Sequence, residues 1–210
     1  MNYQLEVREK IESYPLRELI IANKFLKDKL PYVPANTYYK NIERMSKKGE
    51  LERLAKGVYC RPKVTRFGKI SAGEENILNY YIGKENYTGV VIGYRLYNKY
   101  GITTQVSKSV KIYSNVLEEE KKVIKNVEIK KINISIDSKI KRAVEQLEIL
   151  ENYDEIEDID KNSLIRLYRT IAYLESILNK RRVENTLSQF LNKTSKYKIP
   201  AVEDFYEPAY

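Results

Sequence analysis

The chain has 210 residues, 42% of them hydrophobic, and it carries a formal net charge of +9 without a single histidine. The missing histidine excludes a Ser-His-Asp triad, a Cys-His pair and a histidine-ligated zinc, and no GxxxxGK[ST] or GxGxxG phosphate loop is present. An enzyme would have to work through carboxylates, lysine or tyrosine. We therefore expect a protein that is not an enzyme and that uses no metal and no cofactor.

The N-terminus and the cysteine content predict a cytoplasmic protein. The first residues, MNYQLEVREKIE, are charged throughout and lack the apolar segment of a secretory signal. Cys60 is the only cysteine and cannot form an internal disulfide, which suits a reducing compartment. No apolar run is long enough to span a bilayer, so we expect no membrane partner.

The positive charge is spread unevenly along the chain. Lysine and arginine outnumber aspartate and glutamate by 13 to 8 in residues 1–62 and by 13 to 7 in residues 63–136. In residues 137–210 the balance reverses, with 12 basic and 14 acidic residues. This distribution predicts different partners for the two ends, and nucleic acid suits the basic part.

The first elements expected are a helix, a strand and a second helix. Residues 3–13 form a helical pattern that ends before Pro15, with Leu5, Val7 and Ile11 facing inward. The apolar run at 19–21 predicts a short strand. A helix over 22–29 would then bury Phe25 and Leu26.

A third helix and a tight hairpin are expected between residues 34 and 62. The helix has Asn36 as a capping candidate, an inward stripe of Tyr38, Ile42 and Met45, and Gly49 just after its end. Segments 51–54 and 58–61 are joined by Ala-Lys-Gly at 55–57, which is typical of a hairpin. Helix, strand, helix, helix and two-stranded ribbon is the order of a winged helix-turn-helix domain over residues 1–62.

The outward face of the third helix predicts contacts to DNA. A recognition helix presents amides and hydroxyls to base edges and cations to phosphates. The alternative is an ordinary solvated amphipathic helix, which is also commonly rich in lysine. The predicted contacts to bases or backbone are Asn36, Thr37, Lys40, Asn41 and Arg44, and those to phosphates are Lys47, Lys48, Arg53, Lys56 and Arg61.

Residues 40–59, KNIERMSKKGELERLAKGVY, close on Arg61-Pro62 and resemble the N-terminal winged helix of AbiEi-type abortive-infection antitoxins. The segments 88–93, 101–107 and 110–113 are similar to the region after the wing in that family, so the resemblance covers about residues 1–136. It implies the antitoxin of a bacterial type IV toxin–antitoxin system. Such an antitoxin binds double-stranded DNA at an inverted repeat in its own promoter, which would suit a homodimer. It also counteracts a nucleotidyltransferase-like toxin, with which it need not form a stable complex.

The middle region is predicted to be α+β. Residues 63–73 are expected to be a connector, 74–82 a helix and 118–122 a charged loop or hairpin tip. Alternation predicts strands over 127–130 and 132–136, with a register break between them. Glu128-Ile129-Lys130 also fits the core of a metal-dependent nuclease, but a convincing upstream acidic strand residue is missing, so this is a third hypothesis.

The rest of the chain is predicted to be helical. One stripe would bury Ile140, Ala143, Val144, Leu147 and Leu150, with Lys141, Arg142, Glu145 and Glu148 facing outward. Residues 151–160 are expected to be an acidic linker, and further stripes lie at 164–178 and 183–191, with a basic spot at 180–182. The predicted domains are a winged helix at 1–62 and a partner-binding part at 63–210, subdivided near 137. The alternative is a stand-alone transcriptional regulator whose second domain dimerises or senses a ligand.

Overall fold

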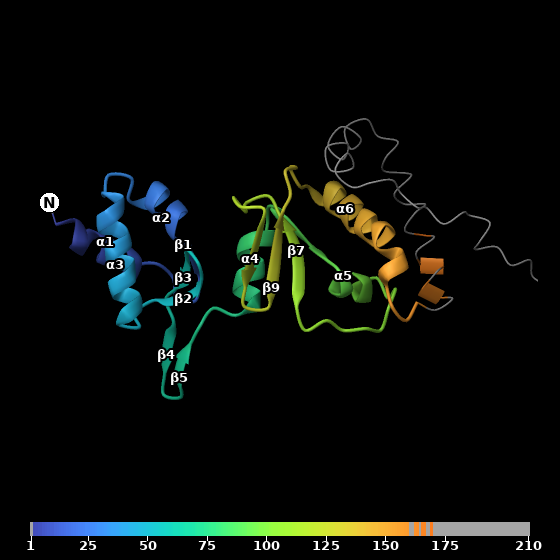
Figure 1. Cartoon of the computed structure of the whole chain (residues 1–210), viewed down its shortest axis with the longest axis horizontal. Coiled ribbons are helices and arrows are strands. Elements are labelled where there is room, and N and C mark those ends of the chain that lie inside the picture. The colour runs from blue at the N-terminus through green and yellow to red at the C-terminus, as the bar shows by residue number, and fades with distance from the viewer. Residues whose placement is uncertain (1, 160–161, 164, 167–168, 170–210) are drawn as a thin grey trace, which may run out of the picture. The chain divides into compact units, whose positions relative to one another are not determined.

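The computed structural model describes residues 2–159, 162–163, 165–166 and 169 (Figure 1). The chain divides into two compact units, residues 1–80 (unit 1) and 81–210 (unit 2). Six α-helices and three sheets lie in the described part, which confirms the α+β class. The predicted domain boundary after residue 62 stays a prediction, although contacts group the next eighteen residues with unit 1.

The first 62 residues of unit 1 form three helices and a small antiparallel sheet of strand order β1-β3-β2. Residue pairing runs from Leu19 opposite Cys60 to Ile21 opposite Val58, so the first strand extends the hairpin that β2 and β3 form. The elements are α1 (Tyr3–Glu12), β1 (Leu19–Ile21), α2 (Ala22–Lys29), α3 (Ala35–Lys47), β2 (Glu52–Ala55) and β3 (Val58–Cys60).

The core of unit 1 confirms most of the predicted inward residues. Val7 and Ile11 of α1 are fully buried, and the stripe of α3 packs against them together with Phe25 of α2. The prediction for Leu5 was wrong, because its side chain is exposed on the opposite side of α1. Leu26 is half-buried and lines the edge of this core.

The predicted connector at 63–73 is instead a β-hairpin, and that prediction was wrong. Strands β4 (Lys63–Thr65) and β5 (Gly68–Ile70) pair antiparallel, with Lys63 opposite Ile70. The hairpin projects from the rest of unit 1 (Figure 1). Helix α4 (Glu74–Ile82) comes after it, as predicted.

Unit 2 is built on a four-stranded mixed sheet of order β6-β7-β9-β8. Strands β7 and β9 are parallel, and the other two pairings are antiparallel. The described elements are β6 (Gly89–Ile92), α5 (Tyr94–Lys99), β7 (Val110–Ser114), β8 (Lys121–Ile124), β9 (Val127–Lys131), α6 (Ser138–Glu151) and a short 3-10 helix (Tyr153–Glu155).

Helix α6 packs against β6 and α5 and closes the core of unit 2. Its Ala143, Val144 and Leu147 are fully buried and form one cluster with Val90 of β6 and Leu96 of α5. Asp137 caps the helix, because its carboxylate accepts the backbone N–H groups of residues 139 and 140. Among the described helices, none combines the length and apolar character needed to cross a membrane.

The predicted strand at 132–136 was wrong. Ile132, Ile134 and Ile136 alternate inward as a strand would require, but the segment bends at Ile134 and forms no strand ladder. Its polar groups find other partners, for example the Ile134 carbonyl, which accepts a hydrogen bond from the Asn115 amide at 3.0 Å. Burial of the isoleucines therefore explains the alternation without a fifth strand.

Two predictions about the acidic residues near α6 were also wrong. Glu145 and Glu148 were expected to face outward, but both are buried beneath tyrosine hydroxyls of α5 and β7. The acidic segment after α6 is not a free linker, since Ile156 is buried and the Thr103 hydroxyl donates to the Glu157 carbonyl at 2.7 Å. The stripes at 164–178 and 183–191, the basic spot at 180–182 and the final tail fall almost wholly outside the described residues.

Candidate nucleic-acid interface

Helix α3 is held in place by a strongly amphipathic sequence. Tyr38, Ile42 and Met45 recur at helical spacing and are almost completely buried in the core of unit 1. The helix ends where Gly49 adopts a φ of +70°, a conformation that glycine takes without strain. This packing fixes which side of the helix faces solvent.

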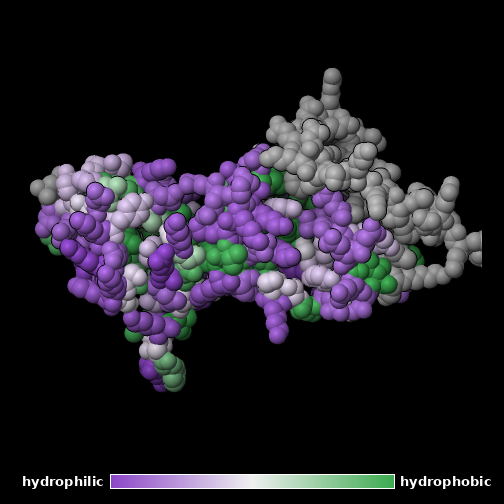
Figure 2. Space-filling model, in the orientation of Figure 1, coloured by the Kyte–Doolittle hydropathy of each residue, from purple (hydrophilic) through white to green (hydrophobic). Residues whose placement is uncertain are grey.

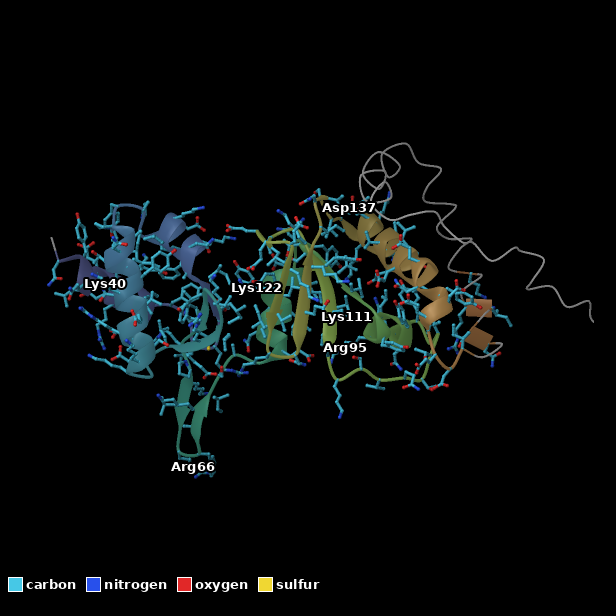
Figure 3. All side chains as sticks on the ribbon, viewed as in Figure 1. Lys40, Arg66, Arg95, Lys111, Lys122 and Asp137 are labelled. Carbon is cyan, nitrogen blue, oxygen red and sulfur yellow. The ribbon has the colours of Figure 1, made fainter. Side chains whose placement is uncertain are left out.

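The solvent-facing side of α3 carries a stripe of polar and basic side chains, which we call the α3 stripe. Each member lies three or four positions from another, so they share one face of the helix. They are Asn36, Lys40, Glu43, Arg44 and Lys47, and all are exposed. Figure 3 places Lys40 on this helix. Lys48 is exposed at the helix end, and Thr37 is half-buried beside the stripe.

The α3 stripe also contains one carboxylate, Glu43. Glu43 forms an ion pair with Lys47 at 2.6 Å, and both side chains are largely exposed. The hydrogen bond from Lys47 lowers the pKa of Glu43, which keeps this carboxyl group ionised at neutral pH. An exposed pair of this kind contributes little to stability, so Lys47 can exchange Glu43 for a phosphate at small cost.

Two predicted contributions of asparagine side chains to α3 need correction. Asn36 does not cap the helix, because Pro34 occupies the N-cap position and Asn36 lies in the first turn with its side chain exposed. Asn41 is not on the outer face: it is buried, and its amide donates to the Thr37 carbonyl at 2.8 Å. Of the two amides, Asn36 is therefore the one exposed to solvent.

The β2–β3 ribbon contributes two exposed cations and one that serves the fold. Arg53 and Lys56 are exposed, and Lys56 sits in the turn beside Gly57, whose φ is +72°. Arg61 was predicted to reach a phosphate, but its guanidinium donates to the backbone carbonyl of Tyr14. The guanidinium thereby ties the end of β3 to the segment after α1.

The β4–β5 hairpin adds three cations within the segment that was expected to be a connector. Lys63, Arg66 and Lys69 are exposed, and Figure 3 shows Arg66 at the hairpin tip. The alternation of Lys-Val-Thr with Gly-Lys-Ile around Arg66-Phe67 was the pattern that could have revealed the hairpin. Unit 1 therefore presents cations from α3, from the β2–β3 turn and from this hairpin.

The polar residues of unit 2 do not assemble a metal site in the part of the chain that the structure describes. No group of three or more His, Cys, Asp or Glu side chains is close enough there to hold an ion. Glu128, the acidic residue of the nuclease-like pattern, pairs with Lys121 at 3.0 Å. The hydrogen bond from Lys121 lowers the pKa of Glu128, which is what an ion pair on a strand surface produces.

Comparison with known proteins adds a family but no activity. A family model described as "Family of unknown function (DUF6088)" matches residues 6–175 of the chain. This match begins in α1 and continues beyond α6, so it covers both units. No curated protein matches the chain. The function therefore has to be argued from the residues themselves.

Proposed function

We propose that this chain, which belongs to the DUF6088 family of unknown function, binds double-stranded DNA through unit 1. The proposal takes residues 1–62 of unit 1 as a winged helix, with α3 as its recognition helix and the β2–β3 ribbon as its wing. The element order α1-β1-α2-α3-β2-β3 and the pairing of β1 with the ribbon support this assignment.

The observation that carries the proposal is the composition of the α3 stripe. An exposed amide, Asn36, precedes two exposed cations, Lys40 and Arg44, on one face of a helix whose other face is locked in a core. Amides discriminate bases in the major groove, and cations neutralise phosphates. The exposed Lys56 of the ribbon turn supplies a further phosphate contact.

We further propose that the DNA is the protein's own promoter and that the protein acts as an antitoxin. This step rests on the resemblance of residues 40–59 to AbiEi-type antitoxins. The chain would bind an inverted repeat there, repress its operon and counteract a nucleotidyltransferase-like toxin encoded beside it. It would do so without enzymatic activity of its own, and the surface acting on the toxin would lie in unit 2.

A mobility-shift titration on the promoter duplex tests DNA binding. Lys40→Ala with Arg44→Ala should weaken binding by about 1–3 kcal/mol for each lost base contact and flatten its dependence on salt, because fewer counterions are released. Lys84→Ala with Lys139→Ala is the matched control, since it removes two exposed positive charges from unit 2. Equal binding by the two double variants would refute the role of α3.

The antitoxin role has a separate test in growing cells. The adjacent open reading frame is induced alone and with this protein supplied in trans. Growth arrest by the neighbour and rescue by this chain would support an antitoxin. A harmless neighbour would leave a DNA-binding regulator as the function.

A further inference from the structure

The β4–β5 hairpin exposes apolar side chains that a folded protein normally buries. Phe67 is 86% exposed and Val64 is 72% exposed, and Ile70 is also exposed on the same short hairpin. Figure 2 shows hydrophobic and hydrophilic residues side by side on this projection. Leaving an aromatic ring in water forgoes the free energy of its burial, so the hairpin gains stability from whatever covers it.

The hairpin is nevertheless firmly attached to unit 1 at both ends. Pro62 before it and Ala72 after it are buried, and the Ala72 N–H points to the sulfur of Cys60 at 3.5 Å. The guanidinium of Arg17 donates to the Ser71 carbonyl at 3.2 Å. Lys69 donates to the Gly49 carbonyl at 2.7 Å, which ties β5 to the C-terminal end of α3.

The turn of the hairpin is also ordered by its own side chains. The Thr65 hydroxyl donates to the Gly68 carbonyl at 2.8 Å and accepts the Phe67 N–H at 3.3 Å. The guanidinium of Arg66 lies 4.6 Å from the centre of the Phe67 ring. The tip is therefore a pre-arranged pair of a cation and an aromatic ring, and ordering it upon binding costs little further entropy.

The charge of the hairpin indicates the kind of partner. Residues 63–73 contain three cations, Lys63, Arg66 and Lys69, and no acidic residue. An apolar tip bordered only by positive charge complements an anionic ligand that also offers flat apolar surfaces. Nucleic acid has both properties, in its phosphates and its stacked bases.

We propose that the β4–β5 hairpin is a second DNA-contacting element, in which Phe67 enters the minor groove as a wedge between base pairs while Arg66, beside its ring, contacts the edge of the groove or a phosphate. Proteins that insert apolar side chains at such a step partly unstack it and bend the duplex. Three strand residues at about 3.3 Å each carry the tip about 10 Å from the hairpin base. With the base held at the end of α3, this reach suits the groove beside the one that α3 occupies. The inference rests on the proposed DNA binding of unit 1.

The test measures affinity and bending separately. The promoter duplex is labelled at its two ends, and energy transfer between the labels reports the bend while a mobility shift reports binding. Phe67→Ala should bind about tenfold more weakly and lose most of the bend, whereas Phe67→Leu, which keeps an apolar wedge, should retain much of it. Val106→Ala is the control, because Val106 is an equally exposed apolar residue in unit 2. Phe67 lies outside the core of unit 1, so these variants should fold as the wild type does.

The outcomes separate the hairpin from the α3 proposal. If Phe67→Ala binds and bends the duplex as the wild type does, the hairpin inference is overturned while DNA binding by α3 stands. If the wild type shifts neither the promoter duplex nor a random-sequence duplex, both proposals fall. Phe67-dependent binding to phosphatidylserine vesicles with no effect of Phe67 on DNA would overturn the wedge in favour of a lipid surface.

Discussion

The hydroxyl of Tyr100 donates a 2.7 Å hydrogen bond to one carboxylate oxygen of Glu145, while Lys99 approaches the other oxygen at 3.0 Å. Glu145 is only 3% exposed, so this carboxylate lies inside unit 2 with two donors from the end of α5. Burial, followed by the hydrogen bond to Glu145, raises the pKa of Tyr100 and keeps its hydroxyl protonated as a donor. The pair links α5 to α6.

Removing that carboxylate should destabilise unit 2. In Glu145→Ala the hydroxyl of the half-buried Tyr100 loses its carboxylate acceptor, so we expect the free energy of unfolding to fall by about 1–3 kcal/mol. Chemical denaturation of wild type, Glu145→Ala, Tyr100→Phe and the double variant gives the coupling between the two side chains. Glu120→Ala removes an exposed carboxylate and should change stability by less than about 0.5 kcal/mol. A coupling of zero would show that the hydrogen bond contributes nothing.

A second buried carboxylate should make stability depend on pH. Glu148 accepts hydrogen bonds from Tyr97 at 3.4 Å and from Tyr113 at 3.3 Å. Burial raises the pKa of Glu148, and the positive charge of Lys130 only partly opposes this shift. A raised pKa means that the folded state holds the proton more tightly than the unfolded chain does. The contribution of Glu148 to the free energy of unfolding is therefore present at low pH and is lost as the pH rises through its folded-state pKa.

Comparison with Glu148→Gln isolates this contribution, because glutamine has the same shape and does not ionise. We expect the wild type to lose stability relative to Glu148→Gln as the pH rises above about 4, where an unshifted glutamate begins to ionise. Lowered carboxylate pKa values elsewhere, such as that of Glu128, act in the opposite direction but are common to both proteins. A difference that stays constant with pH would contradict the prediction.

Two glycines with similar backbone geometry provide a matched test of the hairpin attachment. Gly57 and Gly49 have φ values of +72° and +70°. A Cβ at Gly57 would meet nothing within 4 Å, whereas one at Gly49 would lie 2.5 Å from the Nζ of Lys69. Gly57→Ala should therefore lower the free energy of unfolding only by the strain of alanine at a positive φ, about 1–2 kcal/mol.

Gly49→Ala should lower the free energy of unfolding by a similar amount. Its added methyl group should also displace Lys69 from the Gly49 carbonyl. Thermal unfolding measures the loss of stability that both variants share. Amide hydrogen exchange of residues 63–70 measures how far the hairpin loosens. We expect faster exchange there in Gly49→Ala than in Gly57→Ala. Equal exchange in the two variants would mean that Lys69 does not hold the hairpin.

The sequence predicted those elements in which a residue pattern reflects a single requirement, such as one buried face or one turn. Helix α3 has a single apolar stripe, and the turn of the β2–β3 ribbon carries a glycine where positive φ is needed. The helical stripe of α6 was predicted correctly, but its burial on the other side was not, because every residue from Ala143 to Ile149 is buried. Two glutamates within that run looked outward-facing because charged residues usually are, and only the tyrosines of α5 and β7 reveal why they are not.

In the candidate site, too, the sequence predicted the exposed face of α3 but not the contacts of every side chain. Helical spacing placed Lys40 and Arg44 correctly on the exposed face of α3. It could not show that the Asn41 amide turns back to the Thr37 carbonyl. Helical spacing does not tell whether an asparagine side chain bonds to its own helix backbone or points into solvent. Nor could it show that Arg61 has a backbone acceptor in Tyr14, which lies 47 positions earlier in the chain.

The contrast between the two asparagines of α3 can be measured directly. Asn36→Ala and Asn41→Ala make the same substitution at an exposed and at a buried position of α3, so the difference between them reports their surroundings. Asn41→Ala loses a buried hydrogen bond and should be less stable than Asn36→Ala by about 1 kcal/mol. Asn36→Ala should instead weaken promoter binding by about 1–3 kcal/mol, because only its amide is free to face a base edge. Mobility shift and chemical denaturation of both variants give the two quantities. If Asn41→Ala were the one that lost affinity while keeping its stability, the buried amide would have to turn outward on DNA, and the bond to Thr37 would be a resting contact of the free protein.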